Sequence, residues 1–299
     1  MDIFDVIIVG AGPAGLNAAV VLGRCNRKVL LFDHGKQRNR HAQGMHNYLT
    51  RDDISPKKFL KLSLEEIKKY GVKFLRLEIH SAKKEKDNLF AVRDVKGKMY
   101  QSRKMLLATG LADILPEVTG TTRFYGTSIH HCPYCDGWEH NNEKIGVYSK
   151  DKSGVELAQT LQRWSDDITL FTDGENFMTA SLKKILKKKN IALVEEDINA
   201  FKGRGSVMKY VELKNGDKIG CDTIFFCTGY CVQSHLVDSL GCNTGENHIA
   251  LTDDSQKTNV EGLYVAGDTT KDIHFVVVAA AEGAKAAVYI NKELVEEDT

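Results

Sequence analysis

The sequence predicts an α/β protein of two three-layer domains, in which the first domain is discontinuous and encloses the second. Three observations lead to this fold class. A β-branched run, a glycine turn, an apolar helix and a second strand follow one another over residues 4–33. A similar unit begins at residue 144, and strands that end in Thr-Gly recur at residues 105–110 and 224–229. Strands that alternate with helices favour parallel sheets covered by helices, so we expect both domains to be Rossmann-like.

The composition excludes several classes of protein. The chain has 299 residues, of which 42% are hydrophobic, which is enough for one large domain or two ordinary ones. Its 41 basic and 40 acidic residues leave a formal charge of +1, so we expect neither nucleic acid nor an anionic membrane as a partner. The apolar runs are far shorter than the roughly 20 residues of a membrane-spanning helix, and the start lacks the features of a signal peptide. We therefore expect a cytoplasmic protein.

The start of the chain carries the strongest local signal. Residues 4–9 form a predicted buried strand, and a GxGxxG pattern separates it from an apolar helix. Gly10 permits a tight turn, Gly12 lets the backbone approach a pyrophosphate, and Gly15 allows close packing of helix and strand. The helix N-terminus presents free N–H groups to the phosphates. Asp33, at the end of the next strand, would accept hydrogen bonds from a ribose diol, so a dinucleotide site is predicted here rather than an ordinary glycine-rich turn.

Three later strands would bring further groups to the carboxyl edge of a sheet, where α/β proteins bind ligands. Two of them end in Thr-Gly, the first at Thr109 and Gly110 and the second at residues 228–229. A third strand leads to Gly267 and Asp268.

A second βαβ unit is predicted in the middle of the chain. Residues 144–148 and 167–171 form its strands, and residues 155–161 form its helix. We interpret the two units as an internal repeat of one architecture.

Cys132 and Cys135 form a CxxC pair among seven cysteines. Two thiols at this spacing can close a small disulfide ring and supply a nucleophile and a resolving group. A structural zinc site with His130 and His131 is the alternative, but the sequence offers no second CxxC or spaced histidine pair to complete four ligands, and we expect no metal. The other cysteines are interpreted as bystanders, since seven is an odd count and too few for a secreted disulfide framework: Cys25, Cys221, Cys227, Cys231 and Cys242.

Together these motifs resemble those of the low-molecular-weight thioredoxin reductases, flavoenzymes of the pyridine nucleotide–disulfide oxidoreductase group. The resemblance rests on GAGPAG at residues 10–15, CPYCDG at residues 132–137, and AGD at residues 266–268 before an Ala-rich helix. It runs over essentially the whole chain. It implies a homodimer and three segments, which are an FAD-binding domain in two parts and an inserted CxxC and degenerate NAD(P)H-type domain: residues 1–112, 243–299 and 113–242.

The resemblance also assigns roles to single residues. Cys135 would face the flavin, Cys132 would attack the partner's disulfide, and Asp136 would shuttle a proton during exchange. Asp268 would hydrogen-bond the ribityl chain, and a helix beginning near Phe275 would direct its N-terminus at the flavin's pyrimidine edge. The residues expected to bind FAD are Gly10, Gly12, Pro13, Ala14, Gly15, Asp33, Asn47, Thr109, Gly110, Gly267, Asp268, Phe275 and Val276.

The sequence departs from the family pattern in its second βαβ unit. The three glycines that relatives place after this strand are Ser149, Lys150 and Asp151 here. Their side chains would fill the space of a pyrophosphate, and Asp151 would repel it. The basic cluster that holds the 2′-phosphate of NADPH is also missing, since residues 171–177 contain no arginine. We therefore do not expect NADPH in the ordinary mode, although NADH in a modified mode stays open.

The sequence thus predicts an FAD-dependent thiol–disulfide oxidoreductase that passes electrons from FAD through Cys132 and Cys135 to thioredoxin or a similar small redox protein. Its electron donor would be non-standard. Ferredoxin is the candidate, because ferredoxin-dependent flavin thioredoxin reductases resemble this chain in lacking both nucleotide motifs. The lysine-rich residues 183–189 could dock such an acidic donor, but a solvated helix face is the default interpretation.

Three alternative functions stay open. The first is an oxygen-dependent dithiol oxidase of small molecules, a branch that shares the HCPYC motif at residues 131–135 and the stretch at residues 162–167. Those oxidases usually carry His after the second cysteine, so Asp136 favours the reductase. The second is an ordinary NAD(P)H-dependent thioredoxin reductase. The third is a redox-sensing flavoprotein without turnover.

Overall fold

The computed structural model describes residues 2–270 and 273–299, and the chain divides into two compact units. Unit 1 is formed by three segments, which are Met1–Arg40, Asn47–Ala112 and Cys231–Thr299. Unit 2 is formed by His41–His46 and Asp113–Tyr230. The chain therefore leaves unit 1, builds unit 2 and returns.

The return to unit 1 comes at Cys231, earlier than the boundary at residue 243 expected from the sequence. The reason lies in the short helix α7, whose Leu236 and Val237 are almost fully buried in the core of unit 1. A four-residue helix gives no clear periodic signal, so the sequence did not place it in this core.

Unit 1 is built on a seven-stranded sheet with the order β3-β2-β1-β6-β5-β4, in which β17 also pairs with β6. β6 is long enough to pair antiparallel with β5 through its first half and parallel with β17 through its second. The strands β3, β2, β1 and β6 are parallel, as the βαβ pattern predicts. The strands are β1 (Ile3–Val9), β2 (Val29–Phe32), β3 (Lys73–Leu75), β4 (Ile79–Lys84), β5 (Phe90–Asp94), β6 (Met99–Leu107) and β17 (Leu263–Val265).

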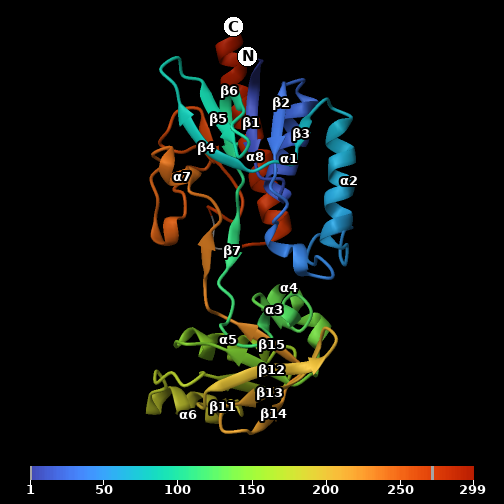
Figure 1. The fold of residues 1–299 in the computed structure, drawn as a ribbon, viewed down its shortest axis with the longest axis vertical. Helices are drawn as coiled ribbons and strands as arrows, with labels where there is room; N and C mark the ends of the chain where they lie inside the picture. Colours follow the sequence, from blue (N-terminus) through green and yellow to red (C-terminus); the bar gives the residue numbers. More distant parts are fainter. Residues whose placement is uncertain (1, 271–272) are drawn as a thin grey trace. The chain divides into compact units, whose positions relative to one another are not determined.

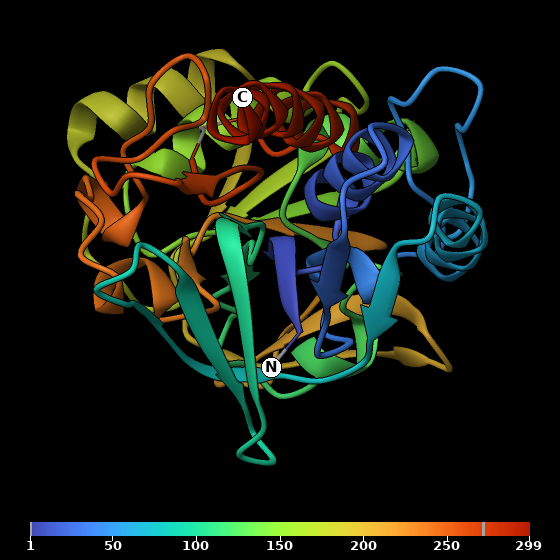
Figure 2. The ribbon, with the colours of Figure 1, turned by 90° about the horizontal axis from the view of Figure 1, so that it is seen from above.

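The sheet of unit 1 is apolar on both faces because its central strands alternate between two cores. Val6 and Ile8 of β1 face a core shared with α1 and α8, whereas Ile7 and Val9 face a core shared with β4, β5 and α7. Figure 2 shows α1 and α8 side by side over the sheet. The helices in the segments of unit 1 are α1 (Pro13–Arg24), α2 (Pro56–Lys68), α7 (Leu236–Ser239), η3 (Glu246–His248) and α8 (Val276–Asp298), and η1 (Arg38–His41) begins in unit 1 and ends at the first residue of unit 2.

Small residues allow α1 and α8 to approach closely. A Cβ added at Gly283 of α8 would lie 1.9 Å from the carbonyl oxygen of Ala14 in α1, far inside contact distance. Such an approach fixes the position of the first turn of α1, which follows the GxGxxG motif.

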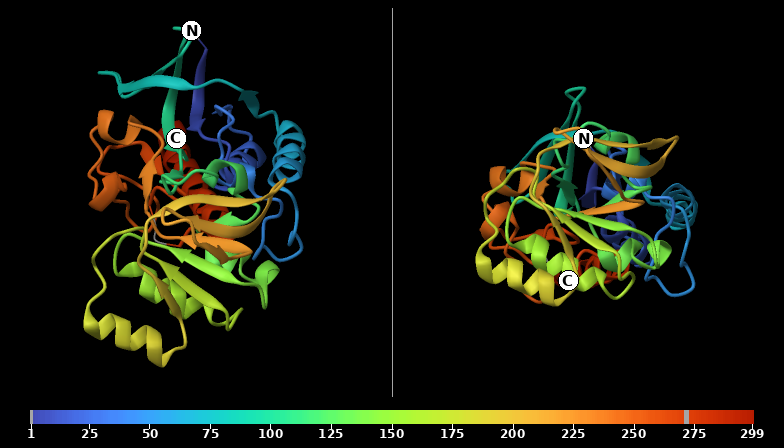
Figure 3. Two further views of the ribbon diagram at one scale, coloured as in Figure 1. Left: turned by 60° about the horizontal axis from the view of Figure 1, so that its bottom comes forward. Right: turned by 90° about the horizontal axis from the view of Figure 1, so that it is seen from below.

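Unit 2 is built on a five-stranded parallel sheet with the order β11-β10-β9-β15-β8 and a three-stranded antiparallel sheet. The small sheet packs on one face of the parallel sheet and the helices α5 and α6 on the other, as Figure 3 shows. The strands are β8 (Ile129–His130), β9 (Ile145–Tyr148), β10 (Ile168–Phe171), β11 (Ala192–Val194), β15 (Thr223–Phe226), β12 (Ile198–Arg204), β13 (Val207–Leu213) and β14 (Lys218–Gly220). The helices are α3 (Thr121–Phe124), α4 (Pro133–Asp136), η2 (Trp138–His140), α5 (Ser153–Leu161) and α6 (Ala180–Lys188).

Two short strands carry the chain out of unit 1 and back. They are β7 (Leu111–Asp113) and β16 (Tyr230–Val232), and they pair with each other (Figure 1). Each unit is therefore a layered α/β structure with a parallel sheet, and the fold class predicted from the sequence is confirmed. Within the described residues, none of the helices is long and apolar enough to cross a membrane.

We expect Gly283→Ala to destabilise unit 1. The new methyl group would collide with the backbone of Ala14, at a cost of about 1–3 kcal/mol that exceeds the gain of about 1 kcal/mol in helix propensity. The thermal midpoint should fall by several degrees. Gly245→Ala is the matched control, because its Cβ would meet only Leu251 at 3.4 Å. Equal midpoints for both variants would show that the two helices can separate at no cost.

Candidate functional site

The glycine turn of unit 1 is shaped by two close approaches. Gly10 has a φ of +108° and donates its N–H to the carbonyl of Phe32 at 2.8 Å. A Cβ at Gly10 would lie 2.1 Å from the carbonyl oxygen of Ala108, and a Cβ at Gly15 would lie 1.9 Å from that of Gly10. Both positions therefore require glycine for reasons of packing alone.

Gly12 has a different reason to be glycine. A Cβ at this position would meet no atom of the described chain within 4 Å, so it would project into open space. Gly12 is also the N-cap of α1, and no side chain in the described part of the protein caps that helix end. The turn thus leaves free N–H groups beside a space that a Cβ would fill, and this arrangement fits a pyrophosphate.

Asp33, which directly follows β2, holds the glycine turn in place through hydrogen bonds. Its Oδ2 accepts the N–H of Ala11 at 2.8 Å, while Oδ1 accepts from the N–H of Gly35 at 2.6 Å and from Gln37 Nε2 at 2.9 Å. The side chain is buried. Three donors leave a carboxylate with little spare capacity, so the structure gives Asp33 a positioning role beside the ribose contact expected from the sequence, which stays a prediction.

The end of β6 brings a second group to the same place. Thr109 Oγ1 is buried and has no hydrogen-bond partner among the described residues. The N–H of the next residue, Gly110, donates a hydrogen bond to Thr269 Oγ1 at 3.2 Å. A buried hydroxyl without a partner is rare in a folded protein, and a polar ligand bound here would satisfy it.

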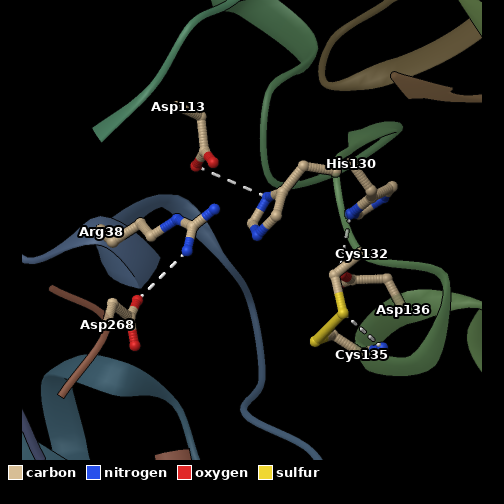
Figure 4. The surroundings of a disulfide bond; sticks show 8 residues. Arg38, Asp113, His130, Cys132, Cys135, Asp136 and Asp268 are labelled. Atoms are coloured by element: carbon tan, nitrogen blue, oxygen red, sulfur yellow. Dashed lines mark hydrogen bonds and ion pairs between the residues drawn. A yellow bond between two sulfur atoms is a disulfide. The ribbon is translucent and has the colours of Figure 1, made fainter. Parts of the chain in front are cut away.

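The segment that follows β17 completes this cluster with one ion pair and one further carboxylate that accepts hydrogen bonds. Asp268 accepts a hydrogen bond from Arg38 at 3.1 Å, and both side chains are largely buried (Figure 4). Glu282 of α8 accepts from the N–H of Gly267 at 2.8 Å and from Thr270 Oγ1 at 2.9 Å. Sequence analysis missed Arg38 and Glu282, because neither lies in a recognisable motif.

The remaining predicted cofactor residues lie at a helix start and on a separate segment. α8 begins at Val276, with Phe275 as its N-cap and no capping side chain in the described residues. A Cβ at Gly267 would lie 3.8 Å from that of Ala279 in the first turn of α8, so this helix end adjoins the cluster. Asn47 is exposed, has a φ of +62°, and donates its N–H to Asp52 at 3.0 Å. Taken together, unit 1 fits the dinucleotide that the resemblance implies, although the role of each residue stays a prediction.

The cysteine pair lies in unit 2 and forms a disulfide, with 5.3 Å between the Cα atoms. Cys132 is the N-cap of α4, and its Sγ accepts the N–H of Cys135 at 3.1 Å. After reduction this N–H would stabilise a thiolate on Cys132, because a hydrogen bond to a charged acceptor is stronger than one to a neutral acceptor. Neighbouring Tyr134 and Trp138 are 62% and 75% exposed.

Asp136, next to the disulfide, begins a chain of hydrogen bonds, of which Figure 4 shows the first, with His130. Its Oδ1 lies 3.2 Å from Nδ1 of His130, whose Nε2 lies 3.0 Å from Nε2 of His140. His140 Nδ1 in turn lies 2.7 Å from Oε2 of Glu143. From the sequence, His130 was considered as a zinc ligand, and no role was assigned to His140 or Glu143. In the structure the two histidines contact each other and the two carboxylates instead.

The surroundings of Asp136 hold it in its ionised form. Burial acts to raise its pKa, but the hydrogen bond from His130 and the positive charges of His130, His131 and His140 lower it below the ordinary value. His131 is held by Asp113, whose Oδ2 lies 3.5 Å from His131 Nδ1.

The turn after β9 differs from the glycine turn of unit 1. Ser149 is fully buried, and its Oγ donates to the carbonyl of Asp151 at 2.9 Å. The Asp151 carboxylate accepts the N–H of Ser153 at 2.8 Å, in the first turn of α5. Lys150 lies 3.6 Å from Asp173 and 3.7 Å from Glu175. The carboxylate of Asp151 therefore lies at the start of α5, where a phosphate would otherwise bind the free N–H groups.

The other candidate residues from the sequence, which are the remaining cysteines, the possible metal ligands and the lysine-rich segment, do not come together in one site. The five remaining cysteines are free, and Cys227 contacts Ser153 at 3.3 Å rather than Cys231. Among the described residues, no group of three or more ligating side chains is placed to hold a metal ion. In the lysine-rich helix α6, Lys183 pairs with Glu195 at 2.5 Å and Leu186 is buried, which is typical of an amphipathic helix.

Comparisons with known proteins agree over nearly the whole chain. The model of the family described as pyridine nucleotide-disulphide oxidoreductase matches residues 4–283. The thioredoxin reductase sirT of Leptosphaeria maculans is 29% identical, over 97% of this chain and 94% of that protein. The thioredoxin reductase of Bacillus subtilis (strain 168) is 26% identical, over 95% of this chain and 93% of that protein.

Solved structures give the same result. The putative thioredoxin reductase TrxB from Bacillus anthracis superposes with a TM-score of 0.94 at 32% identity, covering 99% of this chain and 100% of the other. The structure of HlmI superposes with a TM-score of 0.95 at 33% identity, covering 99% of this chain and 94% of the other.

We expect Asp136→Asn to lower the free energy of unfolding in a pH-dependent way. Because the folded-state pKa of Asp136 lies below the unfolded value of 3.8, its ionised form stabilises the fold above that pH and loses this effect as the pH falls through the folded pKa. The deficit should be on the order of 2 kcal/mol near pH 6 and shrink below about pH 4. Urea titrations across this range measure it.

Glu261→Gln provides the control, since Glu261 is exposed and pairs with Lys84 at the surface. Its unfolding free energy should match that of the unaltered protein at each pH. A deficit in Asp136→Asn that is equal at pH 6 and pH 3 would contradict the assigned charge state.

Proposed function

Because the chain belongs to the pyridine nucleotide-disulphide oxidoreductase family, we propose that it binds FAD in unit 1 and reduces the disulfide of thioredoxin or a similar small redox protein through Cys132 and Cys135. Its relatives are thioredoxin reductase-like enzymes, and the family implies a flavin cofactor. When bound, the flavin would supply an electron pair to the protein disulfide. The homodimer and the cytoplasmic location expected from the sequence stay predictions.

The observation that carries this proposal is the surroundings of the Cys132–Cys135 disulfide. The pair is only partly buried, so an incoming disulfide can reach it. The N–H of Cys135 is directed at Cys132 Sγ, which favours Cys132 as the attacking thiolate. Asp136 follows directly and is linked to His130, which places an acid–base group beside the thiols.

The exchange is balanced in electrons and protons. The Cys132 thiolate attacks one sulfur of the partner's disulfide, and the sulfur that leaves takes a proton from Asp136. Cys135 then attacks Cys132 of the mixed disulfide and gives up its own proton to the second sulfur that leaves. The partner gains two electrons and two protons, and the enzyme is left with its disulfide and an ionised Asp136.

The proposed electron donor is not NADPH but a small reduced redox protein such as ferredoxin. A pyrophosphate at the start of α5 would compete with the carboxylate of Asp151 for the N–H of Ser153. A phosphate after β10 would meet the carboxylates of Asp173 and Glu175, which already attract Lys150. Both arrangements oppose a phosphorylated nucleotide.

The proposed partner is a protein. The names of the relatives point to thioredoxin, and two aromatic side chains, Tyr134 and Trp138, lie exposed around the disulfide. Exposed aromatic side chains are enriched at protein interfaces, where they contribute much of the binding energy.

We expect reduced ferredoxin to bleach the flavin of the anaerobic holoenzyme, whereas equimolar NADPH bleaches it at least about 100-fold more slowly. We expect this difference because the carboxylate of Asp151 already binds the N–H of Ser153 at the start of α5. Stopped-flow absorbance near 450 nm, with NADH as a third donor, measures the three rates.

Rapid bleaching by NADPH would overturn the proposed donor. The variant Asp151→Gly is the matched test of the reason, because it removes the carboxylate from the Ser153 N–H. It should accelerate bleaching by a pyridine nucleotide while leaving bleaching by ferredoxin unchanged.

We expect Cys132→Ser and Cys135→Ser each to abolish thioredoxin reduction and to leave flavin bleaching by the donor intact. Turnover is followed by the appearance of thioredoxin thiols, and Cys227→Ser serves as the control because Cys227 lies outside the disulfide. Unchanged turnover in either of the first two variants would contradict the assignment. If the unaltered enzyme instead consumes oxygen with small dithiols and reduces no disulfide, it is a dithiol oxidase.

A further inference from the structure

We propose that Trp164 is a positioning residue of the disulfide site, which holds the turn α4 in place when the disulfide opens and so keeps the N–H of Cys135 directed at Cys132 Sγ. The inference deepens the proposed function and rests on it, because only an enzyme that cycles its disulfide needs a turn that keeps its shape after reduction. Trp164 lies in the stretch at residues 162–167, to which the proposed function assigns no role.

The turn α4 has little support of its own. It spans four residues, and none of them is buried. A single helical turn is not stable in isolation, because too few hydrogen bonds offset the order imposed on its backbone. In the oxidised state the bond between Cys132 and Cys135 adds a covalent link across the turn. Once that bond is reduced, the contacts of the turn with the rest of unit 2 must preserve its shape.

Trp164 makes such a contact at Gly137. Gly137 directly follows α4, is buried, and donates its N–H to the carbonyl of Pro133 at 2.8 Å. A Cβ at Gly137 would lie 2.8 Å and 2.9 Å from two ring carbons of Trp164, and 2.4 Å from the carbonyl oxygen of Pro133. The backbone of Gly137 has a φ of −67° and a ψ of −32°, which any residue can adopt. Glycine is therefore needed here for the close approach of the indole ring and the carbonyl.

The ring of Trp164 also supports α4 at Tyr134. The two rings meet edge to face, with 6.0 Å between their centroids and an angle of 84° between their planes. Asp136, at the end of the turn, is held by His130 instead, at 3.2 Å. Trp164 thus contacts both the turn itself and the residue that follows it.

Trp164 is itself firmly held at the end of α5. Its N–H donates to the carbonyl of Leu161 at 2.9 Å, and its ring packs partly buried against the core that Leu161 shares. The carbonyl of Trp164 accepts the N–H of Asn142 at 2.8 Å, and the neighbouring Ser165 Oγ donates to the carbonyl of Glu143 at 2.6 Å. The chain beyond η2 is therefore bound to the same segment, which makes Trp164 a fixed support.

The position of the turn matters for the charge of Cys132. The N–H of Cys135 lies 3.1 Å from Cys132 Sγ, and a thiolate gains more from this hydrogen bond than a thiol does. If the turn loosens on reduction, the hydrogen bond weakens and Cys132 ionises at a higher pH. An ionisation midpoint one pH unit higher leaves about tenfold less thiolate on the acidic side. Each remaining thiolate is about threefold more nucleophilic, so the net reaction there is about threefold slower.

Site-resolved alkylation of Cys132 tests this role. In the holoenzyme variant Cys135→Ala, Cys132 has lost its disulfide partner and stays reduced. The variant reacts with iodoacetamide from pH 5 to pH 10, and mass spectrometry quantifies the labelled Cys132 peptide. Adding Trp164→Leu should raise the midpoint of the profile by about one pH unit, with alkylation about threefold slower on the acidic side and about threefold faster above the midpoint. A change in access alone would scale the rate equally at every pH.

Three further variants of the Cys135→Ala enzyme sharpen the test. Trp164→Phe keeps an aromatic ring and should bring the midpoint back towards that of the enzyme with Trp164. Phe177→Leu is the matched control, because Phe177 packs partly buried against the same core as Trp164, and it should leave the midpoint unchanged. Gly137→Ala forces the turn away from the ring and should raise the midpoint as Trp164→Leu does. It therefore decides the question even if Trp164→Leu does not fold.

Two outcomes overturn the role of Trp164. One is an unchanged midpoint in folded Trp164→Leu or in Gly137→Ala. The other is an equal rise in Phe177→Leu, which would show that any loosening of the core has this effect. The assay needs neither an electron donor nor a protein partner. Failure of the proposed function would appear separately, as an unaltered holoenzyme that reduces no disulfide.

Discussion

An ionised carboxylate that is mostly removed from water, that of Asp136, is the constraint on which the chemistry of unit 2 depends. Burying such a charge without compensation costs several kcal/mol. The compensation comes from His130, at 3.2 Å, and the pKa of Asp136 is lowered despite burial. His130 can serve in this way because β8 pairs with β15 and brings its ring against Phe225. The central sheet thus determines the charge state of a group that directly follows the Cys132–Cys135 disulfide.

The two βαβ units show how one architecture can carry opposite electrostatics. In unit 1, Gly12 leaves open space and free N–H groups at the start of α1. In unit 2, the carboxylate of Asp151 accepts the hydrogen bond of the Ser153 N–H at the start of α5. The backbone path is similar, since both turns join a parallel strand to a helix. The difference between a turn that fits a phosphate and a turn that opposes one therefore lies in a few side chains, and function follows such side chains rather than the fold.

Sequence reasoning reached most of the fold because the elements that matter are regular. The strands predicted at residues 4–9 and 144–148 are found as β1 and β9 with bounds that differ by one residue, and the CxxC spacing indicated the disulfide. It failed where the information is not local. The contact of His130 with His140 joins a strand to a 3₁₀ turn, and neither residue type nor spacing announces it. The pair of Arg38 with Asp268 is separated by 230 residues of chain, and α7 is too short for a periodic signal.

The account makes the Cys132–Cys135 disulfide an electron acceptor in series with the flavin, and an anaerobic reductive titration tests that claim most directly. The holoenzyme is titrated with dithionite while the flavin absorbance is followed. A redox-active disulfide and a flavin each accept an electron pair, so complete reduction should consume about four electrons per bound FAD. The same titration of Cys132→Ser should consume about two. Complete reduction of the unaltered enzyme by only two electrons would contradict the account.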